Sequence, residues 1–133
     1  MILGVDHIGI AVVDLDESLR LYRDVLGFTD EGRETLEEMR LEIAFLSAGG
    51  THVELLRPLP GETVISRFLE KKGPGIHHIC LEVSDIEEAL AACRANGVEP
   101  VTPVPRPGGR GRLVAFLHPR ATGGVLLEVS QRV

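Results

Sequence analysis

The sequence lacks any block of basic residues. It contains 14 Lys and Arg against 20 Asp and Glu, which gives a formal net charge of −6 at pH 7. A nucleic-acid surface needs a basic face that neutralises phosphates, so the charge balance argues against that class of partner. A small anionic ligand needs only a local cluster of cations and is still compatible with this composition.

Cysteine is also scarce. Cys80 and Cys93 lack the paired spacing of a zinc motif or of a disulfide framework. We therefore expect both residues to be plain buried thiols.

Long apolar runs and a basic leader are absent as well. The apolar start of the chain is interrupted at once by Asp6 and His7, whereas a membrane helix needs about 20 apolar residues in succession. We expect no signal peptide and no membrane span, and hence a soluble cytoplasmic protein. A chain of 133 residues is long enough for a single domain that buries roughly two thirds of its unfolded surface.

What the sequence does contain is an internal duplication. One offset of 71 residues relates three pairs of segments: "VDHIGIAV" (5–12) and "IHHICLEV" (76–83), "DLDESL" (14–19) and "DIEEAL" (85–90), and "AFL" (44–46) and "AFL" (115–117). The same offset relates His7 to His78. A repeat of half the chain length predicts two modules, at about 1–73 and about 74–133, within one domain over 1–133.

Hydrophobic periodicity predicts that each module is one βαβββ unit. We expect strands at about 4–13, 29–36, 40–47, 51–57, 76–83, 112–118 and 124–130, and helices at about 15–26, 63–73 and 86–95. Asp14 and Asp85 stand where helix N-caps would be, and the Pro- and Gly-rich segment 101–112 is expected to be a loop. Because neither module can cover its own sheet, we predict an α+β fold in which both pair into one curved mixed sheet with helices outside.

Alternation along the strands places polar side chains on the face that the helices do not cover. Successive side chains of a strand point to opposite faces, so His7 and His78 lie opposite their apolar neighbours. Glu54 and Glu128 interrupt apolar strands in the same way, in "HVELL" and "VLLEV". Each module therefore carries one histidine and one glutamate on this face.

Two imidazoles and two carboxylates form a plausible ligand set for one divalent cation. Single strand histidines are usually hydrogen-bonded core residues, and single glutamates usually face solvent. Four polar groups in apolar strands would each cost roughly 1–3 kcal/mol without partners, and the repetition of this cost at matched positions favours a metal site. Such nitrogen and oxygen ligands suit Co, Mn, Ni, Fe or Zn better than Mg, and protonation of either type should weaken binding.

A further carboxylate, Glu42, occurs in one module only. It alternates with Leu41, Ile43 and Phe45, and its counterpart under the offset is Leu113. Two readings are open: an exposed edge carboxylate, or a substrate-facing group on the concave face beside Ala44. The remaining histidines have simpler roles. We expect His77 to serve packing or the joint between modules, and His52 and His118 to form surface hydrogen bonds.

Four segments resemble a known family: "DHIGIAV", "GIHHICLEV", "VELLRPL" and "FLHPRATGGVLLEV". Between Val5 and Val129 the chain is similar to the vicinal oxygen chelate superfamily and, within it, to the methylmalonyl-CoA epimerases. The resemblance implies that the metal ligands are His7, Glu54, His78 and Glu128, with cobalt the favoured metal. It also implies that Glu42 is a second catalytic glutamate, although "EEMRLE" lacks the glycine of the usual "EQGV" pattern.

The implied activity is metal-dependent epimerisation of (2R)- and (2S)-methylmalonyl-CoA through an enolate, with Glu42 and Glu128 as the two catalytic acid–base groups. The implied partners are an acyl-CoA substrate and a second copy of the chain in a homodimer. The basic loop with Arg106, Arg110 and Arg112 is a candidate contact for the coenzyme A phosphates.

Three alternatives stay open within this family. They are a glyoxalase I-like lactoylglutathione lyase, an extradiol dioxygenase and a non-catalytic small-molecule binding module. The lyase would need a glutathione site, for which the first half shows no clear basic cluster. A fourth protein ligand at Glu54 disfavours the dioxygenase, and retention of all four ligands disfavours the binding module.

Overall fold

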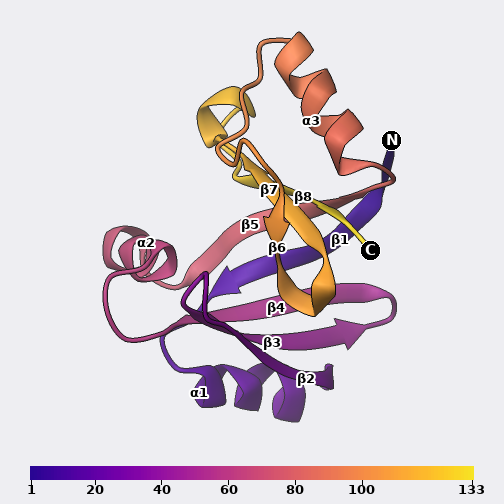
Figure 1. Cartoon of the computed structure of the whole chain (residues 1–133). Coiled ribbons are helices and arrows are strands. Elements are labelled where there is room, and N and C mark those ends of the chain that lie inside the picture. The colour runs from indigo at the N-terminus through magenta and orange to yellow at the C-terminus, as the bar shows by residue number, and fades with distance from the viewer. The chain divides into compact units, whose positions relative to one another are not determined.

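The computed structural model describes residues 1–133, and the chain forms two compact units. One unit is His7–His77, and the other combines Met1–Asp6 with His78–Val133. The boundaries of these units fall between Asp6 and His7 and between His77 and His78, whereas the expected modules meet at about residues 73 and 74; Figure 1 colours the chain by residue number. The first residues of the chain therefore belong with the second module.

The order of elements repeats βαβββ twice. The elements are β1 (Ile2–Ala11), α1 (Leu15–Leu19) with a π-helical continuation (Arg20–Val25), β2 (Thr29–Leu36), β3 (Leu41–Ala48), β4 (Thr51–Pro58), α2 (Val64–Lys72), β5 (Gly75–Val83), α3 (Ile86–Ala95), β6 (Arg106–Pro107), β7 (Leu113–Leu117) and β8 (Leu127–Gln131). The expected α+β class is confirmed. Parallel and antiparallel strand pairs both occur, which confirms the mixed pairing.

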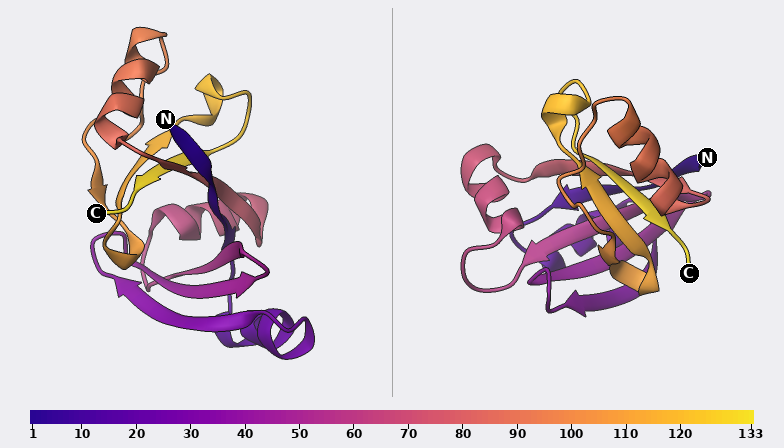
Figure 2. Two further views of the ribbon diagram at one scale, coloured as in Figure 1. Left: turned by 90° about the vertical axis from the view of Figure 1, so that its right-hand side faces the viewer. Right: turned by 45° about the horizontal axis from the view of Figure 1, so that its top comes forward.

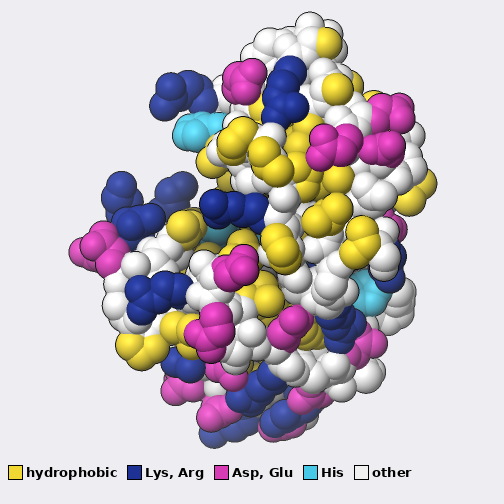
Figure 3. Space-filling model, viewed as in Figure 1, with side chains coloured by type: hydrophobic (Ala, Val, Ile, Leu, Met, Phe, Trp, Pro, Cys, Tyr) yellow, Lys and Arg dark blue, Asp and Glu magenta, His cyan; other side chains and the backbone are white.

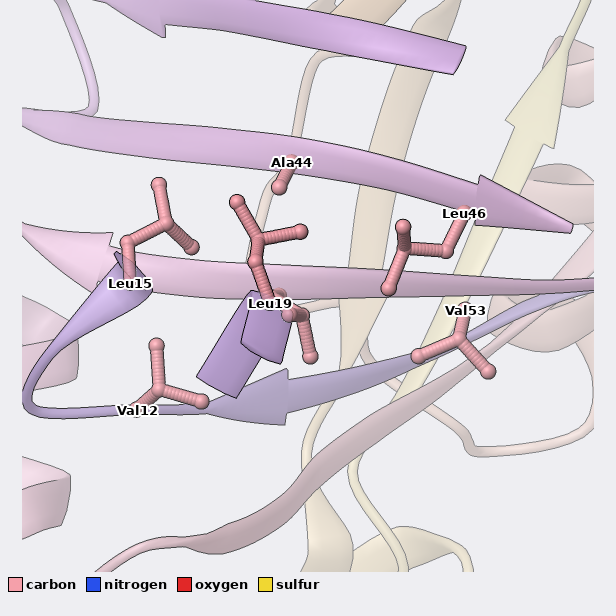
Figure 4. Close-up of a cluster of buried hydrophobic side chains, with 7 residues drawn as sticks. Val12, Leu15, Leu19, Ala44, Leu46 and Val53 are labelled. Atoms are coloured by element: carbon pink, nitrogen blue, oxygen red, sulfur yellow. The ribbon is translucent and has the colours of Figure 1, made fainter. Parts of the chain in front are cut away.

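In the unit His7–His77 the strand order is β2-β3-β4-β1. The β3 and β4 strands form an antiparallel hairpin, and β4 pairs in parallel with β1. Asp14 caps α1 as expected, because its Oδ1 accepts a hydrogen bond from the Glu17 amide at 3.1 Å. Figure 4 shows α1 packed on one face of these strands through Leu15 and Leu19.

Strands β3 and β4 are buried on both faces over most of their length, and the end of β1 packs with them. The α1 side holds Val12, Leu15, Leu19, Ala44, Leu46, Val53 and Leu55. The opposite side holds Ala11, Leu41, Ile43, Phe45, Leu56 and, from α2, Ile65. Two apolar faces explain why these strands read as nearly continuous hydrophobic runs.

In the other unit the strand order is β5-β8-β7-β6. Asp85 caps α3 by accepting a hydrogen bond from the Glu88 amide at 3.1 Å. The α3 core consists of Val83, Ile86, Ala89, Leu90, Ala115, Leu117 and Val129. Figure 2 shows the strands of both units from two further sides.

The segment 101–112 is more structured than a loop. Arg106 and Pro107 form the short strand β6, which pairs with Val114 and Leu113 of β7. Gly108 allows the close approach, because a Cβ atom there would lie 2.7 Å from Cγ1 of Val114. The expectation of a loop was therefore wrong for β6. This short strand pairs with β7 because Gly108 has no side chain to collide with Val114.

Two smaller expectations also need comment. Cys80 is buried, but Cys93 is only half-buried, because it lies on the edge of the α3 core. The expected helix over 15–26 is present, but it changes from α-helical to π-helical hydrogen bonding at Arg20.

Charged side chains of both signs are interspersed on the face drawn in Figure 3. None of the helices combines the length and the apolar character that crossing a bilayer requires.

Candidate functional site

The unit His7–His77 contains a buried histidine and carboxylate in contact. Nδ1 of His7 on β1 lies 3.0 Å from Oε2 of Glu54 on β4, and both residues are buried. The parallel register pairs Gly9 with Glu54, so Glu54 shares the face of Gly9 and His7. This is the face opposite α1, as strand alternation predicted.

The other unit contains an equivalent pair. Nε2 of His78 on β5 lies 3.1 Å from Oε1 of Glu128 on β8, and both residues are again buried. The register pairs Cys80 with Glu128, so Glu128 shares the face of His78 and Cys80, away from the α3 core. The expected placement of His78 and Glu128 on a common face is confirmed.

These pairs explain how four polar side chains are tolerated inside apolar strands. A buried polar atom without a partner costs about 1–3 kcal/mol, and each imidazole lies within hydrogen-bonding distance of its carboxylate. Neutral imidazole and ionised carboxylate are also ligands for divalent transition metals. Within each unit, the buried imidazole and carboxylate are consistent with ligands of a divalent metal ion.

Glu42 does not lie where the sequence reasoning placed it. It shares its face with Ala44 and Leu46, which pack against α1, whereas Leu41, Ile43 and Phe45 share the face of Glu54. The alternation of side chains along β3 was predicted correctly. The assumption that Leu41, Ile43 and Phe45 must face α1 was wrong, because both faces of β3 are buried by apolar residues.

The surroundings of Glu42 are basic. Its Oε1 accepts a hydrogen bond from Nε of Arg57 at 3.1 Å, and its Oε2 lies 3.9 Å from Nη1 of Arg33. Arg33 in turn contacts Asp16 of α1 at 2.8 Å, which confirms that this cluster lies on the α1 side. The geometry supports a structural ion pair for Glu42 and gives no support to its expected place beside the metal ligands.

The segment "EEMRLE" has no glycine, and in the turn before β3 it is an arginine that takes a glycine-like backbone conformation. Arg40 adopts a φ of 53°, in the left-handed region that favours glycine. Its guanidinium donates a hydrogen bond to the carbonyl of Pro60, which ties the turn to the chain beyond β4. A non-glycine residue therefore makes the turn that leads into Leu41 and Glu42.

The basic loop also differs from expectation. Arg112 is buried, pairs with Asp6, and donates from Nε to the carbonyl of Gly109 at 3.0 Å. Arg112 is therefore a structural residue and is not exposed to meet phosphates. Arg106 and Arg110 are exposed, as expected.

Sequence reasoning missed this ion pair. The signal was present in Asp6, a lone acid within an apolar strand, but its partner lies 106 residues away in the chain. No local pattern could have identified Arg112 as that partner.

Two of the other histidines have the simple roles expected of them. The ring of His77 packs edge-on against Phe68 of α2, with 5.0 Å between ring centroids. The exposed His118 accepts a hydrogen bond on Nδ1 from the Arg120 amide at 3.0 Å. His52 is half-buried at the start of β4.

Comparison with known proteins gives a consistent family. The model of the Glyoxalase/Bleomycin resistance protein/Dioxygenase superfamily matches residues 6–116. An uncharacterised protein of Bacillus subtilis is 40% identical over 95% of this chain and 90% of its own. The mitochondrial methylmalonyl-CoA epimerase of Dictyostelium discoideum is 39% identical over 96% of this chain and 77% of its own. The ethylmalonyl-CoA/methylmalonyl-CoA epimerase of Cereibacter sphaeroides is 36% identical over 98% of this chain and 99% of its own.

Solved structures agree with the sequence comparison. Methylmalonyl-CoA epimerase from Mycobacterium tuberculosis superposes with a TM-score of 0.94 at 34% identity, covering 99% of this chain and 89% of that one. A variant of the Streptomyces coelicolor methylmalonyl-CoA epimerase, in complex with 2-nitronate-propionyl-CoA, has a TM-score of 0.93 at 33% identity, covering 100% and 96%.

Proposed function

The chain belongs to the Glyoxalase/Bleomycin resistance protein/Dioxygenase superfamily and is closely related to methylmalonyl-CoA epimerases; from this premise we propose that it interconverts (2R)- and (2S)-methylmalonyl-CoA. The observation that carries the proposal is the repeated pair of buried side chains, His7 with Glu54 and His78 with Glu128. A scaffold that needed only stability would not require this polar set at matched positions.

We propose that these four side chains hold one divalent cation. The donor set fits, because each pair is buried and already brings an imidazole nitrogen within 3.1 Å of a carboxylate oxygen. When bound, the cation would act as a Lewis acid for the negative charge that develops on the substrate's oxygens when the α-proton leaves. Cobalt is the metal that the family resemblance favours.

Glu128 is the residue to which we assign proton transfer at the α-carbon. Its Oε1 lies at the His78 imidazole, and we assign the proton to Oε2. Position is essential here, because a general base must lie within hydrogen-bond reach of the proton that it removes. The Glu128 side chain is buried, which limits access of water to the carboxylate.

Inversion requires a second acid–base group on the other side of the α-carbon. The resemblance assigns this role to Glu42, but its place on the α1 side counts against that assignment. We therefore assign proton transfer on one face of the α-carbon to Glu128, and leave the group that serves the other face to the test of Glu42 below. Homodimer formation and a cytoplasmic location stay predictions from sequence.

Proton NMR of each epimer in deuterated water tests the proposed function. The metal-reconstituted protein should replace the α-proton by deuterium and generate the other epimer, while a chelator-treated sample should do neither. Exchange no faster than in the chelator-treated sample would overturn the proposal. Turnover of a glutathione hemithioacetal without any α-proton exchange in the acyl-CoA would indicate a lyase instead.

A further inference from the structure

Phe116 of β7 adjoins both proposed ligands of its unit. Its ring packs edge-on against the His78 imidazole, with 5.6 Å between centroids and 86° between ring planes. The antiparallel register places Phe116 directly across from Glu128, on the same face of the strands. One aromatic side chain thus borders the imidazole and the carboxylate together.

The first module has a phenylalanine at the equivalent position. Phe45 occupies the same place in the repeated "AFL" segment and lies directly across from Glu54. Phe45 is only 5% exposed and belongs to the core that includes Ile43 and Ile65. Phe116 is half-buried and is not part of the α3 core. Of the two equivalent phenylalanines, Phe45 is therefore a core residue, whereas part of the Phe116 side chain is accessible.

We infer that Phe116 determines which 2-alkyl substituent the site accepts, an inference that rests on the proposed function. A substrate bound at His78 and Glu128 has its α-carbon next to these ligands, so the substituent on that carbon meets the accessible part of the Phe116 ring. The edge-on contact with His78 prevents the ring from turning aside without loss of that packing. Phe116 therefore limits the size of the substituent, and a methyl group is preferred over an ethyl group.

Size discrimination of this kind has a known magnitude, and the names of the relatives include both substrates. One methylene in an apolar pocket changes kcat/KM by roughly 10- to 200-fold. The relative from Cereibacter sphaeroides is named for both ethylmalonyl-CoA and methylmalonyl-CoA. The ratio between these two substrates is therefore the quantity to measure.

The experiment compares Phe116→Leu and Phe116→Ala with Phe45→Leu as the matched control. The ratio of kcat/KM for ethylmalonyl-CoA to that for methylmalonyl-CoA should rise about tenfold or more in the Phe116 variants. Phe45→Leu should lower the melting temperature and leave the ratio within about twofold of the original, because Phe45 lies in the core. An unchanged ratio in a Phe116 variant with native circular dichroism would overturn the inference.

A binding measurement separates this inference from the proposed function. Dissociation constants of propionyl-CoA and butyryl-CoA, measured by calorimetry on the metal-loaded protein, need no turnover. If the original protein exchanges no α-proton but Phe116→Leu strengthens butyryl-CoA binding relative to propionyl-CoA, the function fails and the size limit stands. If Phe116→Leu leaves the ratio of the butyryl-CoA and propionyl-CoA dissociation constants unchanged, Phe116 does not limit the size of the substituent, whatever the rate of α-proton exchange.

Discussion

Asp6 and Arg112 form a buried ion pair that joins the residue before His7 to the residue before β7. Their side chains are 7% and 9% exposed, and Nε of Arg112 is held by the carbonyl of Gly109. A second arginine, Arg132, reaches the same carboxylate at 3.5 Å, but its side chain is 69% exposed. Two arginines on one aspartate thus offer a direct comparison between a buried and an exposed ion pair.

We predict that Arg112→Met lowers the free energy of unfolding by about 3–5 kcal/mol, because it leaves the Asp6 carboxylate buried without its main partner. Arg132→Met should cost no more than about 1 kcal/mol, the usual limit for an exposed pair. Urea denaturation followed by circular dichroism measures both values.

The double variant Asp6→Asn with Arg112→Met is the control for this prediction. It removes the unpaired charge as well as its partner, so it should recover part of the stability lost in Arg112→Met. Equal losses in Arg112→Met and Arg132→Met would show that burial does not distinguish the two pairs.

His78→Ala should abolish high-affinity metal binding. Loss of an outer-shell partner alone weakens metal sites by 10- to 100-fold, so removal of a ligand should weaken this one by more than about 100-fold. Metal content by inductively coupled plasma mass spectrometry and affinity by calorimetry provide the measurement. His118→Ala is the matched control, because His118 is exposed and bonds to the Arg120 amide. A His78→Ala protein with full metal content would remove His78 from the site.

Asp30 makes a small contribution to stability that depends on pH. A hydrogen bond from the Gly32 amide, followed by one from Arg23, lowers the pKa of the Asp30 carboxyl. A lowered carboxyl pKa stabilises the folded protein above the unfolded value of about 3.9, and this gain is lost as the pH falls through the folded pKa.

Asp30→Asn should therefore reduce the free energy of unfolding by about 0.2–1 kcal/mol at pH 7, because the side chain is largely solvated and screening limits the pair. Asn keeps an oxygen for the Gly32 amide, so the substitution isolates the charge. The difference from the original protein should shrink below about pH 4 and stay constant between about pH 5 and 8. A difference that grows on acidification would contradict the assigned cause.

Repetition within the chain made the fold and both members of each candidate pair, one histidine and one glutamate, readable from sequence. The helix caps Asp14 and Asp85, and the faces of His7 and His78, depend on local spacing alone, and the structure agrees with them. The pairing of Asp6 with Arg112 depends on long-range packing, so no local pattern encodes it. Glu42 was misplaced because alternation gives two faces but does not say which one the helix covers.

The variant Glu42→Gln decides between two roles for Glu42: the catalytic role that the family resemblance implies, and the structural ion pair on the α1 side of β3. If Glu42 were the second acid–base group, the substitution would slow α-proton exchange by roughly 10²- to 10⁴-fold. Because Glu42 instead pairs with Arg57 on the α1 side, we expect exchange within about threefold of the original rate and a stability loss of at most about 1 kcal/mol. Glu128→Gln, measured in the same assay, should show the full loss. A comparable loss in Glu42→Gln, with metal content and melting temperature unchanged, would mean that Glu42 reaches the substrate despite its face on β3.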